Sequence, residues 1–554
     1  MVVYVEYDVE CPCSDGTVLR ADVYRPAGQG IYPVLLLRLP YDKSNRHYYK
    51  GYLDVPRMVA AGYVVILQDV RGRYASDGTY YPFVYERKDG YEAVEWAAAL
   101  PYANGKVGMF GMSYHGYTQL AAAAETPPSL YAIAPVMAIA DGWVDMVQDE
   151  TMPFDQGSLA TWALESILPD QLKRQDRDKE LERAHAYIDE LPFRLHDQPI
   201  REWAPIKKTV PNSFYFDFVN RQITEQTIQQ VDVREKLKHI HIPALFIGGW
   251  FDSLLGQTLG AYQQFGGKRM LWIGPWTHSN LDGWAGDVFF EHATSPLGVD
   301  QLKDLTDLHI KWFGHWLKDK PLNIEKPVHV YHMGKRRWDG QERWPPNNAG
   351  ISRYHLNHHE NTSLQNSVRT LEKKKPETNQ TDQCPRNPAA PFPTRGGNLL
   401  MAGHGAGMFE QGDLHEREDA LVFTTQPLDI PLEVLGTIAA NVWVSSDSPL
   451  LDLFLQVSDV TPDGKVYNVV DTFIRRTVDD RGRPRHVQVD LTPTSYRFGK
   501  GHAIRLAIAG SNAPRFDVNQ NNGTTSRTAT GGVPANDILY YGGQYPSSLS
   551  IPIR

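Results

Sequence analysis

Gly105-Lys-Val-Gly-Met-Phe-Gly-Met-Ser-Tyr-His-Gly116 is the stretch of sequence that decides the fold of this chain. Its apolar first half predicts a strand, and the Tyr-Thr-Gln-Leu-Ala-Ala-Ala-Ala that follows predicts a helix, so a tight turn at Ser113 joins them. A serine on such a turn holds its hydroxyl above the edge of a sheet, near the positive end of the helix. Gly111 and Gly116 let the backbone bend that sharply. Ser113 is therefore a candidate nucleophile.

The serine turn departs from the usual pattern of such turns in one position. That pattern has glycine two residues after the serine, where this chain has His115, and glycine follows one position later. An ordinary junction between a strand and a helix is the alternative interpretation. His115 itself is expected to point away from the serine oxygen, because residues two apart do not share a helical face.

Two later apolar runs end in the residues that a nucleophilic serine needs. Ile242–Asp252 is an apolar run of strand length that ends in an acid. Lys268–His278 is a second such run, and it ends in a histidine. Hydrolases built on such a turn carry the serine, the acid and the histidine in this order along the chain. Asp252 could instead cap a helix, and His278 could bond the backbone. Their common order favours Asp252 as the orienting acid and His278 as the base for Ser113.

Further motifs run in order along nearly the whole chain: Pro40-Tyr-Asp-Lys43, the run 68–78, the run 89–96, the serine turn, Gly274-Pro-Trp-Thr-His278, and Ser511-Asn-Ala-Pro-Arg-Phe-Asp517 followed by Asn521-Asn-Gly523. Together they resemble the bacterial cocaine esterase and X-Pro dipeptidyl peptidase family. That family has a tyrosine after the serine and the glycine at the later position. The resemblance implies an α/β-hydrolase core with a helical cap insertion and a C-terminal all-β jelly-roll domain.

The resemblance also implies an oxyanion hole made from the phenol of Tyr41 and the backbone amide of Tyr114. Acyl transfer puts negative charge on the former carbonyl oxygen, and preorganised donors aimed at that oxygen lower the barrier. Packing in a loop rich in Tyr and Asp is the alternative for Tyr41. Asp69, Arg71 and Asp89 are interpreted as a structural ion-pair network near the sheet.

The hydrophobic periodicity divides the chain into four segments. Residues 1–145 alternate strands with helices such as 91–100, which predicts the first part of a mostly parallel sheet. Residues 146–240 are predicted to form a helical cap, with a charged helical stretch at 170–191. Residues 241–320 resume the core and close it with a helix at 301–317. Residues 321–554 predict a β-sandwich, with strands at 327–333, 437–444, 451–457 and 503–508 and a polar loop at 357–398.

Composition bounds the class of protein and its partners. A chain of 554 residues with 42% hydrophobic residues and a formal net charge of −9 is expected to form two or three folded domains, without nucleic acid as partner. The beginning of the chain has no basic leader before an apolar segment, and no run approaches the ~18 apolar residues of a membrane helix. We expect a cytoplasmic protein with no membrane partner. The resemblance implies that homo-oligomers can form.

Neither a metal nor another cofactor is expected. Three cysteines, Cys11, Cys13 and Cys384, are too few for a disulfide framework and are predicted to be free thiols. The pair Cys11-Pro-Cys13 lacks the two-residue spacer of zinc and redox pairs. The histidines at 355, 358 and 359 lack the spacing of a zinc hydrolase.

The function predicted from these residues is cleavage of carboxylic esters through an acyl-enzyme on Ser113. Hydrolysis of amides by the same site is the alternative, as in X-Pro dipeptidyl peptidases, α-amino acid ester hydrolases or β-lactam acylases, and a ligand-binding scaffold without catalysis is the alternative of another class. An aryl or branched acyl group would need an apolar pocket, for which the candidates are Trp143, Phe154, Trp162, Phe251 and Leu254. An ammonium-bearing substrate would need carboxylates at the rim, for which the candidates are Asp145, Asp149, Glu150 and Asp155; a solvated face is the alternative.

Overall fold

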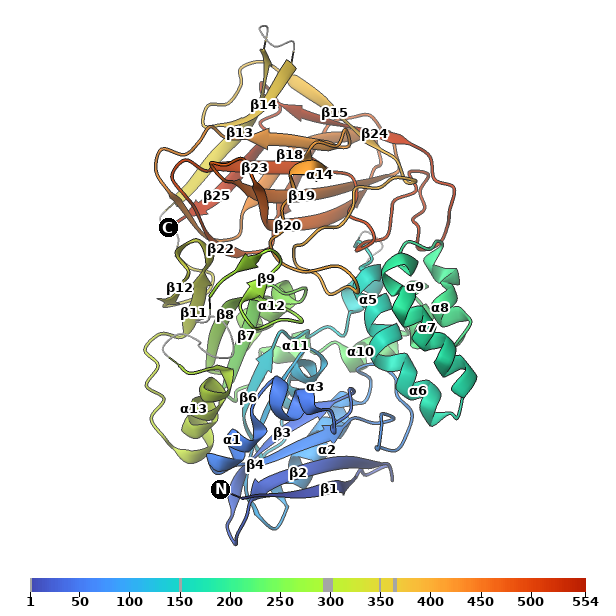
Figure 1. Cartoon of the computed structure of the whole chain (residues 1–554), viewed down its shortest axis with the longest axis vertical. Helices are drawn as coiled ribbons and strands as arrows, with labels where there is room; N and C mark the ends of the chain where they lie inside the picture. Colours follow the sequence, from blue (N-terminus) through green and yellow to red (C-terminus); the bar gives the residue numbers. More distant parts are fainter. Residues whose placement is uncertain (1, 149–151, 292–301, 348–349, 362–365) are drawn as a thin grey trace.

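The computed structural model describes residues 2–148, 152–291, 302–347, 350–361 and 366–554. Figure 1 shows a mixed α/β core at one end of the molecule and a β-rich domain at the other. A group of helices, coloured teal, stands beside the core and reaches the β-rich domain. The chain passes through the core, the helices, the core again and then the β-rich domain.

A ten-stranded sheet forms the core, in the order β1-β2-β4-β3-β5-β6-β7-β8-β11-β12. From β4 to β11 every neighbouring pair is parallel. Parallel strands covered on both faces are apolar without alternation, as in β4, where all six residues are buried. The strands are β1 (Val3–Pro12), β2 (Val18–Pro26), β3 (Tyr32–Leu39), β4 (Val64–Asp69), β5 (Ala103–Met112), β6 (Leu130–Val136), β7 (Ala244–Phe251), β8 (Arg269–Thr277), β11 (Val328–His332) and β12 (Arg337–Gln341).

Helices cover both faces of this sheet. Apolar residues of α2, α3 and α12 belong to one hydrophobic cluster, and those of α1 and α13 belong to another on the opposite face. The helices predicted at 91–100 and 301–317 correspond to α2 and α13. Their bounds are α1 (Val55–Ala60), α2 (Glu86–Ala98), α3 (Tyr114–Ala123), α12 (Leu255–Gln264) and α13 (Leu305–Lys318), with the short elements η1 (His47–Gly51), β9 (Trp284–Ala285), β10 (Val288–Phe289) and η5 (Met333–Lys335).

The insertion between β6 and β7 is helical, as predicted. The stretch 170–191 forms two helices, α6 and α7, separated at residues 175–177. The elements of this cap are α4 (Val144–Gln148), α5 (Gln156–Thr161), η2 (Trp162–Ile167), α6 (Leu168–Arg174), α7 (Asp178–Arg194), η3 (Ile200–Glu202), α8 (Ala204–Lys207), α9 (Phe214–Val219), α10 (Glu225–Val231) and α11 (Arg234–Leu237).

The rest of the chain forms the β-rich domain. It contains β13 (Gly350–Asn361), β14 (Asn366–Glu372), β15 (Gln380–Arg386), α14 (Gly412–His415), β16 (Ala420–Thr424), β17 (Leu432–Gly436), β18 (Ala439–Ser446), β19 (Leu450–Val460), β20 (Val466–Thr477), β21 (Arg485–Asp490), β22 (Thr494–Phe498), β23 (Ala503–Ala509), β24 (Ala535–Tyr541) and β25 (Ser548–Ile553). The predicted fold class is confirmed, and the strands predicted near 437, 451 and 503 are β18, β19 and β23.

Two local predictions differ from the structure. The run 327–333, assigned above to the β-sandwich, forms β11, which pairs in parallel with β8 of the core. All five residues of β11 are buried, which agrees with a strand covered on both faces. The stretch 357–398 is also not one loop, because it holds the end of β13 and the whole of β14 and β15. Exposed and buried residues alternate along β15, as expected for a strand with one buried face.

A buried ion-pair cluster in the β-rich domain holds the start of the cap. Arg475 lies between two carboxylates, at 2.8 Å from Asp452 and 2.9 Å from Asp517. Asp517 also accepts a hydrogen bond from the backbone amide of Phe154, at 2.9 Å. The cap segment therefore docks on a buried charge cluster in which Arg475 pairs with both carboxylates.

We predict that Arg475→Met destabilises the protein by about 3 to 5 kcal/mol, because it leaves two buried carboxylates without their cation. Urea denaturation followed by circular dichroism measures the loss. Arg476→Met is the matched control, since Arg476 is exposed on the same strand. Equal stability of the two variants would contradict the prediction.

Candidate active site

The turn between β5 and α3 holds Ser113 in a strained backbone conformation. Ser113 has a φ of +61°, a region that side-chain-bearing residues seldom adopt. The two glycines of the turn are required by close packing. A Cβ on Gly111 would lie 2.5 Å from Nδ1 of His115, and one on Gly116 would lie 2.7 Å from the Cβ of Ala138.

His115 stabilises this turn and does not face the serine as a base. Its Nδ1 accepts a hydrogen bond from the backbone amide of Met112, at 2.6 Å. Burial lowers the pKa of His115 to about 3, so the ring is neutral and can accept that bond. This histidine occupies the position where the usual pattern has glycine, and its hydrogen bond with the Met112 amide stabilises the turn.

The three predicted residues lie together at the carboxyl ends of their strands. The Oγ of Ser113 is 2.9 Å from Nε2 of His278, and Nδ1 of His278 is 2.7 Å from Oδ1 of Asp252. Asp252 is 1% exposed and His278 is 6% exposed. The buried carboxylate fixes the imidazole with its Nδ1 protonated, which leaves Nε2 free to accept the serine proton.

Tyr41 lies beside Ser113 with its hydroxyl oriented by a tryptophan. The indole Nε1 of Trp162 donates a hydrogen bond to the Tyr41 oxygen, at 2.8 Å. Burial raises the pKa of Tyr41 to about 12, so the phenol keeps its proton at neutral pH. With one lone pair occupied by Trp162, the Tyr41 hydroxyl is a donor that can point toward the serine.

Tyr114 is the first residue of α3, so its backbone amide has no earlier helical carbonyl to donate to. Its side chain lies away from the serine. The phenol donates to Glu86, at 2.9 Å, and accepts from the amide of Phe83, at 2.9 Å. Glu86 in turn pairs with the buried Arg38, at 2.8 Å. The helix that follows the serine is therefore anchored by buried hydrogen bonds and an ion pair.

The residues interpreted as a structural network do form ion pairs. Arg71 pairs with Asp89 at 2.7 Å, whereas Asp69 pairs with Lys43 at 3.5 Å. Burial raises the pKa of Asp69 to about 7. Lys43 belongs to the same loop as Tyr41, and its amide donates to Asp69 at 2.8 Å. This network fixes the loop that carries Tyr41.

A cavity of about 330 Å³ opens at Ser113, and we name it the serine cavity. Its walls come from the core, the cap and the β-rich domain. They are Tyr41, Phe83, Ser113, Tyr114, Ile139, Asp141, Trp143, Asp145, Met146, Met152, Pro153, Asp155, Ser158, Leu159, Trp162, Ser253, Leu254, Gln257, Leu400, Arg515 and Phe516. An apolar cavity with a few convergent polar groups is the usual form of a small-molecule site.

Three of the five predicted pocket residues line this cavity: Trp143, Trp162 and Leu254. The other two do not. Phe154 is fully buried where the cap docks on Asp517, and Phe251 stacks on Phe290 with ring centroids 6.2 Å apart. Both aromatic rings pack in the hydrophobic core instead.

Carboxylates also line the serine cavity. Asp145 pairs with Arg234 at 2.6 Å, and Asp155 is 3.8 Å from Arg515. Asp141, which the sequence analysis did not name, accepts the backbone amide of Trp143 at 3.1 Å, and burial raises its pKa to about 6. Asp149 and Glu150 lie outside the described residues.

Sequence reasoning missed the contribution of the β-rich domain. Leu400, Arg515 and Phe516 line the serine cavity, although they follow Ser113 by hundreds of residues. Arg515 also lies 3.5 Å from Asp471 of β20. The motif 511–517 was the available signal, because it contains Arg515 and Phe516 and belongs to the family resemblance.

Other features of the described residues bear on cofactors and membranes. No cluster of three or more His, Cys, Asp and Glu side chains suited to a metal ion occurs among them. All three cysteines are buried free thiols, as predicted, and burial raises the pKa of Cys11 to about 12. In the part of the chain that the structure describes, no helix is both long enough and apolar enough to cross a bilayer.

Comparisons with known proteins identify the relatives of this chain. The model of the X-Pro dipeptidyl-peptidase (S15) family matches residues 15–280, and that of the X-Pro dipeptidyl-peptidase C-terminal non-catalytic domain matches residues 323–550. The chain is 30% identical to the cocaine esterase of Rhodococcus sp. (strain MB1 Bresler), over 99% of this chain and 98% of that protein. It is 25% identical to a putative serine esterase of Mycobacterium bovis, over 91% and 90% of the two chains.

Solved structures show the same fold over the whole chain. An α-amino acid ester hydrolase superposes with a TM-score of 0.82 at 20% identity, covering 100% of this chain and 97% of that chain. An aminopeptidase from a marine sediment Thaumarchaeota archaeon superposes with a TM-score of 0.80 at 21% identity, covering 100% and 96%. The two family models and the full-length match to an esterase show that the chain belongs to the S15 family of X-Pro dipeptidyl-peptidases and related serine esterases, and that it is a serine hydrolase.

Proposed function

We propose that the chain hydrolyses carboxylic esters through an acyl-enzyme on Ser113, with His278 as base and Asp252 as orienting acid. The continuous hydrogen-bond chain from Asp252 through His278 to Ser113 supports this proposal most directly. Ser113, the last residue of this hydrogen-bonded series, lines the serine cavity, so a substrate carbonyl can approach its hydroxyl.

The proposed reaction proceeds in two acyl transfers. As the Ser113 oxygen attacks the acyl carbon, Nε2 of His278 takes its proton, and Asp252 stabilises the resulting imidazolium. The bond from the acyl carbon to the leaving oxygen breaks, and that oxygen receives the proton from His278. Water then attacks the acyl-enzyme with His278 again as base, which releases the acid and restores the serine.

Tyr41 and Tyr114 are proposed to hold the oxyanion of each tetrahedral intermediate. The Tyr41 phenol keeps its proton and is oriented by Trp162. The Tyr114 amide follows the serine directly at the start of α3. A preorganised donor helps most where charge develops in the transition state and water is excluded.

We propose an aromatic or branched acyl group as the preferred acid. Trp143 and Trp162 stand in the serine cavity with ring centroids 5.1 Å apart, and Leu254 lines it near the acid. These side chains give flat apolar surfaces for such a group. No cofactor takes part in this mechanism.

A second candidate is hydrolysis of esters or amides whose acyl part carries an ammonium. The observation that favours it is Asp141, a buried carboxyl in the serine cavity that, among the described residues, accepts hydrogen bonds from the backbone amides of Trp143 and Asp145. A panel of p-nitrophenyl acyl esters beside aminoacyl and X-Pro anilides separates the two candidates.

Cytoplasmic location, homo-oligomer formation and the absence of nucleic acid partners stay predictions.

We predict that Ser113→Ala lowers turnover by about four to six orders of magnitude, because the nucleophile is lost while the fold stays intact. Hydrolysis of p-nitrophenyl esters measures this loss, with circular dichroism as the control for folding. A fluorophosphonate probe should label the unmodified protein once per chain, at Ser113. Normal turnover of the variant would rule out Ser113 as the nucleophile, whereas no labelling of the folded, unmodified protein would favour the non-catalytic scaffold.

We predict that Tyr41→Phe lowers kcat by about 100-fold, since the loss of one oxyanion donor costs on the order of 3 kcal/mol of transition-state stabilisation. KM should change little, because the phenol serves the transition state more than the ground state. Unchanged kcat would require that the oxyanion be held elsewhere.

We predict that Trp162→Phe lowers kcat by about five- to ten-fold, because it removes the hydrogen bond that orients the Tyr41 hydroxyl. The double variant Tyr41→Phe, Trp162→Phe should be no slower than Tyr41→Phe alone, since Trp162 would act through the phenol. Trp143→Phe is the control, as it changes an indole in the same cavity that does not bond Tyr41. Additive losses in the double variant would show that Trp162 acts independently of Tyr41.

A further inference from the structure

A cavity of about 330 Å³ lies between the core and the β-rich domain, and we name it the His502 cavity. The core contributes β10, η5 and the residues that follow them, and the β-rich domain contributes parts of β19, β20 and β22 with the loop after β22. The strands β20 and β22 lie where the β-rich domain borders the core (Figure 1). No residue that lines the His502 cavity lines the serine cavity, so this is a separate site.

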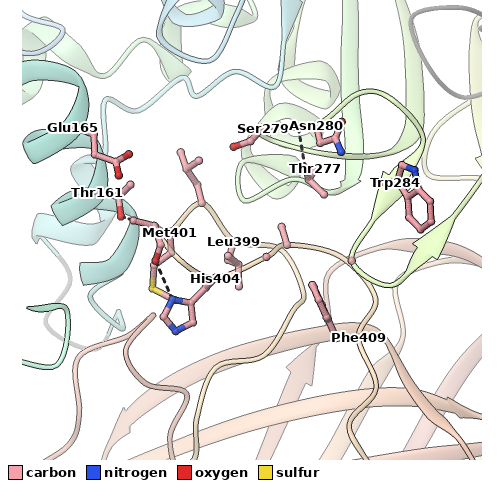
Figure 2. A pocket seen from close by; sticks show the side chains of 15 residues that line it. Thr161, Glu165, Thr277, Ser279, Asn280, Trp284, Leu399, Met401, His404 and Phe409 are labelled. Atoms are coloured by element: carbon pink, nitrogen blue, oxygen red, sulfur yellow. Dashed lines mark hydrogen bonds between the residues drawn. The ribbon is translucent and has the colours of Figure 1, made fainter. Parts of the chain in front are cut away.

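One wall of the His502 cavity is formed where the segment after His278 pairs with a loop of the β-rich domain. The backbone amide of Asp287 donates to the carbonyl of Met408, at 2.7 Å. Met408 lines the His502 cavity. Trp284 and Phe409, on the same two segments, line a cavity of about 390 Å³ that Figure 2 shows. The paired segments are therefore a wall common to both cavities.

An aspartate and a tyrosine orient the ring of His502 at the wall of its cavity. Nδ1 of His502 is 2.9 Å from Oδ1 of Asp459, and the Tyr496 hydroxyl donates to Oδ2 at 2.8 Å. Asp459 is 2% exposed, so its carboxylate serves these two partners. Nε2 of His502 makes no hydrogen bond within the described residues and is not enclosed by protein atoms. This nitrogen is available to a ligand.

Arg497 brings to the cavity a positive charge without a close partner. Among the described residues its guanidinium donates no hydrogen bond, and its ion-pair partner Glu433 is 4.0 Å away. Glu433 has a closer partner in Lys335, at 2.6 Å. Arg336 also lines the cavity, and its pair with Glu291, at 3.2 Å, is about half exposed on both sides and therefore weak. The cavity thus offers guanidinium donors to an anion.

Most of the other walls are apolar. Val288 and Phe290 come from the core, and Met408 comes from the β-rich domain. Met333 adds a further apolar side chain from η5. An inorganic anion would leave these side chains without contacts, whereas an anion with a hydrocarbon part matches both the donors and the apolar walls.

We propose that the His502 cavity binds a small carboxylate that carries an aromatic or branched hydrocarbon group. Arg497 pairs with the carboxylate, and the protonated ring of His502 donates to it from Nε2 while Nδ1 stays on Asp459. The hydrocarbon group packs on the apolar walls. Because these walls come from both domains, a bound carboxylate stabilises the contact between them. The inference goes beyond the proposed hydrolysis at Ser113 and does not rest on it.

The test titrates benzoate and its neutral analogue benzamide into the protein by isothermal titration calorimetry. We expect benzoate to bind about five-fold more tightly than benzamide, as one solvent-accessible ion pair allows. Arg497→Gln should weaken benzoate by about five-fold and leave benzamide unchanged. Arg481→Gln is the matched control, since Arg481 is an exposed arginine of the same domain outside the cavity.

A second variant, His502→Gln, tests the other donor and should also weaken benzoate more than benzamide. Circular dichroism checks that each variant is folded. Thermal unfolding gives an independent measurement, because a ligand that binds only the folded protein raises the midpoint. Benzoate should raise the midpoint of the unmodified protein and of Arg481→Gln more than that of Arg497→Gln.

Benzoate could instead enter the serine cavity, and Trp143→Ala separates the two sites because Trp143 lines only the serine cavity. Weaker benzoate binding by Arg497→Gln than by Arg481→Gln supports the inference, whether or not Ser113 is catalytic. The inference is overturned if benzoate and benzamide bind the unmodified protein equally or not at all. It is also overturned if Arg497→Gln and Arg481→Gln bind benzoate equally, or if Trp143→Ala abolishes a preference that Arg497→Gln retains.

Discussion

The strained turn at Ser113 is the constraint on which the rest of the structure depends. A φ of +61° at a residue with a side chain costs about 1 to 3 kcal/mol, and it persists only where the surroundings hold it. Here three residues of the turn stabilise this conformation. Gly111 and Gly116 remove the Cβ atoms that would clash, and His115 accepts the Met112 amide inside the turn. This rigidity aims the Ser113 oxygen at His278 before any substrate arrives.

Closure of the site depends on the β-rich domain as much as on the hydrolase core. The Asn398 amide donates to the backbone carbonyls of Trp250 and Asp252, at 2.7 and 3.0 Å, so a loop of that domain holds the end of β7. Two residues further along this loop, Leu400 lines the serine cavity. Arg515 approaches Asp155 at the start of the cap. A domain described as non-catalytic in the family thus forms walls of the site, and its stability is coupled to the geometry around the acid.

The sequence predicted what is local and failed where distant segments meet. The sequence predicted Ser113, Asp252 and His278 because each follows an apolar run and the three come in a fixed order along the chain. They lie close together because the carboxyl ends of the parallel strands meet at one edge of the sheet. Leu400, Arg515 and Phe516 were not, because nothing in a single sequence tells which loops of a β-rich domain face a distant serine. Phe154 and Phe251 show the complementary error: an aromatic residue near a site in sequence is often part of the core. The run 327–333 was misplaced for a related reason, since a short apolar strand fits a parallel sheet and a sandwich equally well.

The carboxyl of Asp141 bears on how such a site can discriminate among esters. Burial raises the pKa of Asp141 to about 6, and a cation bound beside it would favour its ionised form. A substrate with positive charge in the acyl part would therefore gain an interaction that a neutral substrate lacks. Because the triad geometry is common to both substrates, discrimination would arise from the side chains of the cap and the β-rich domain that line the serine cavity.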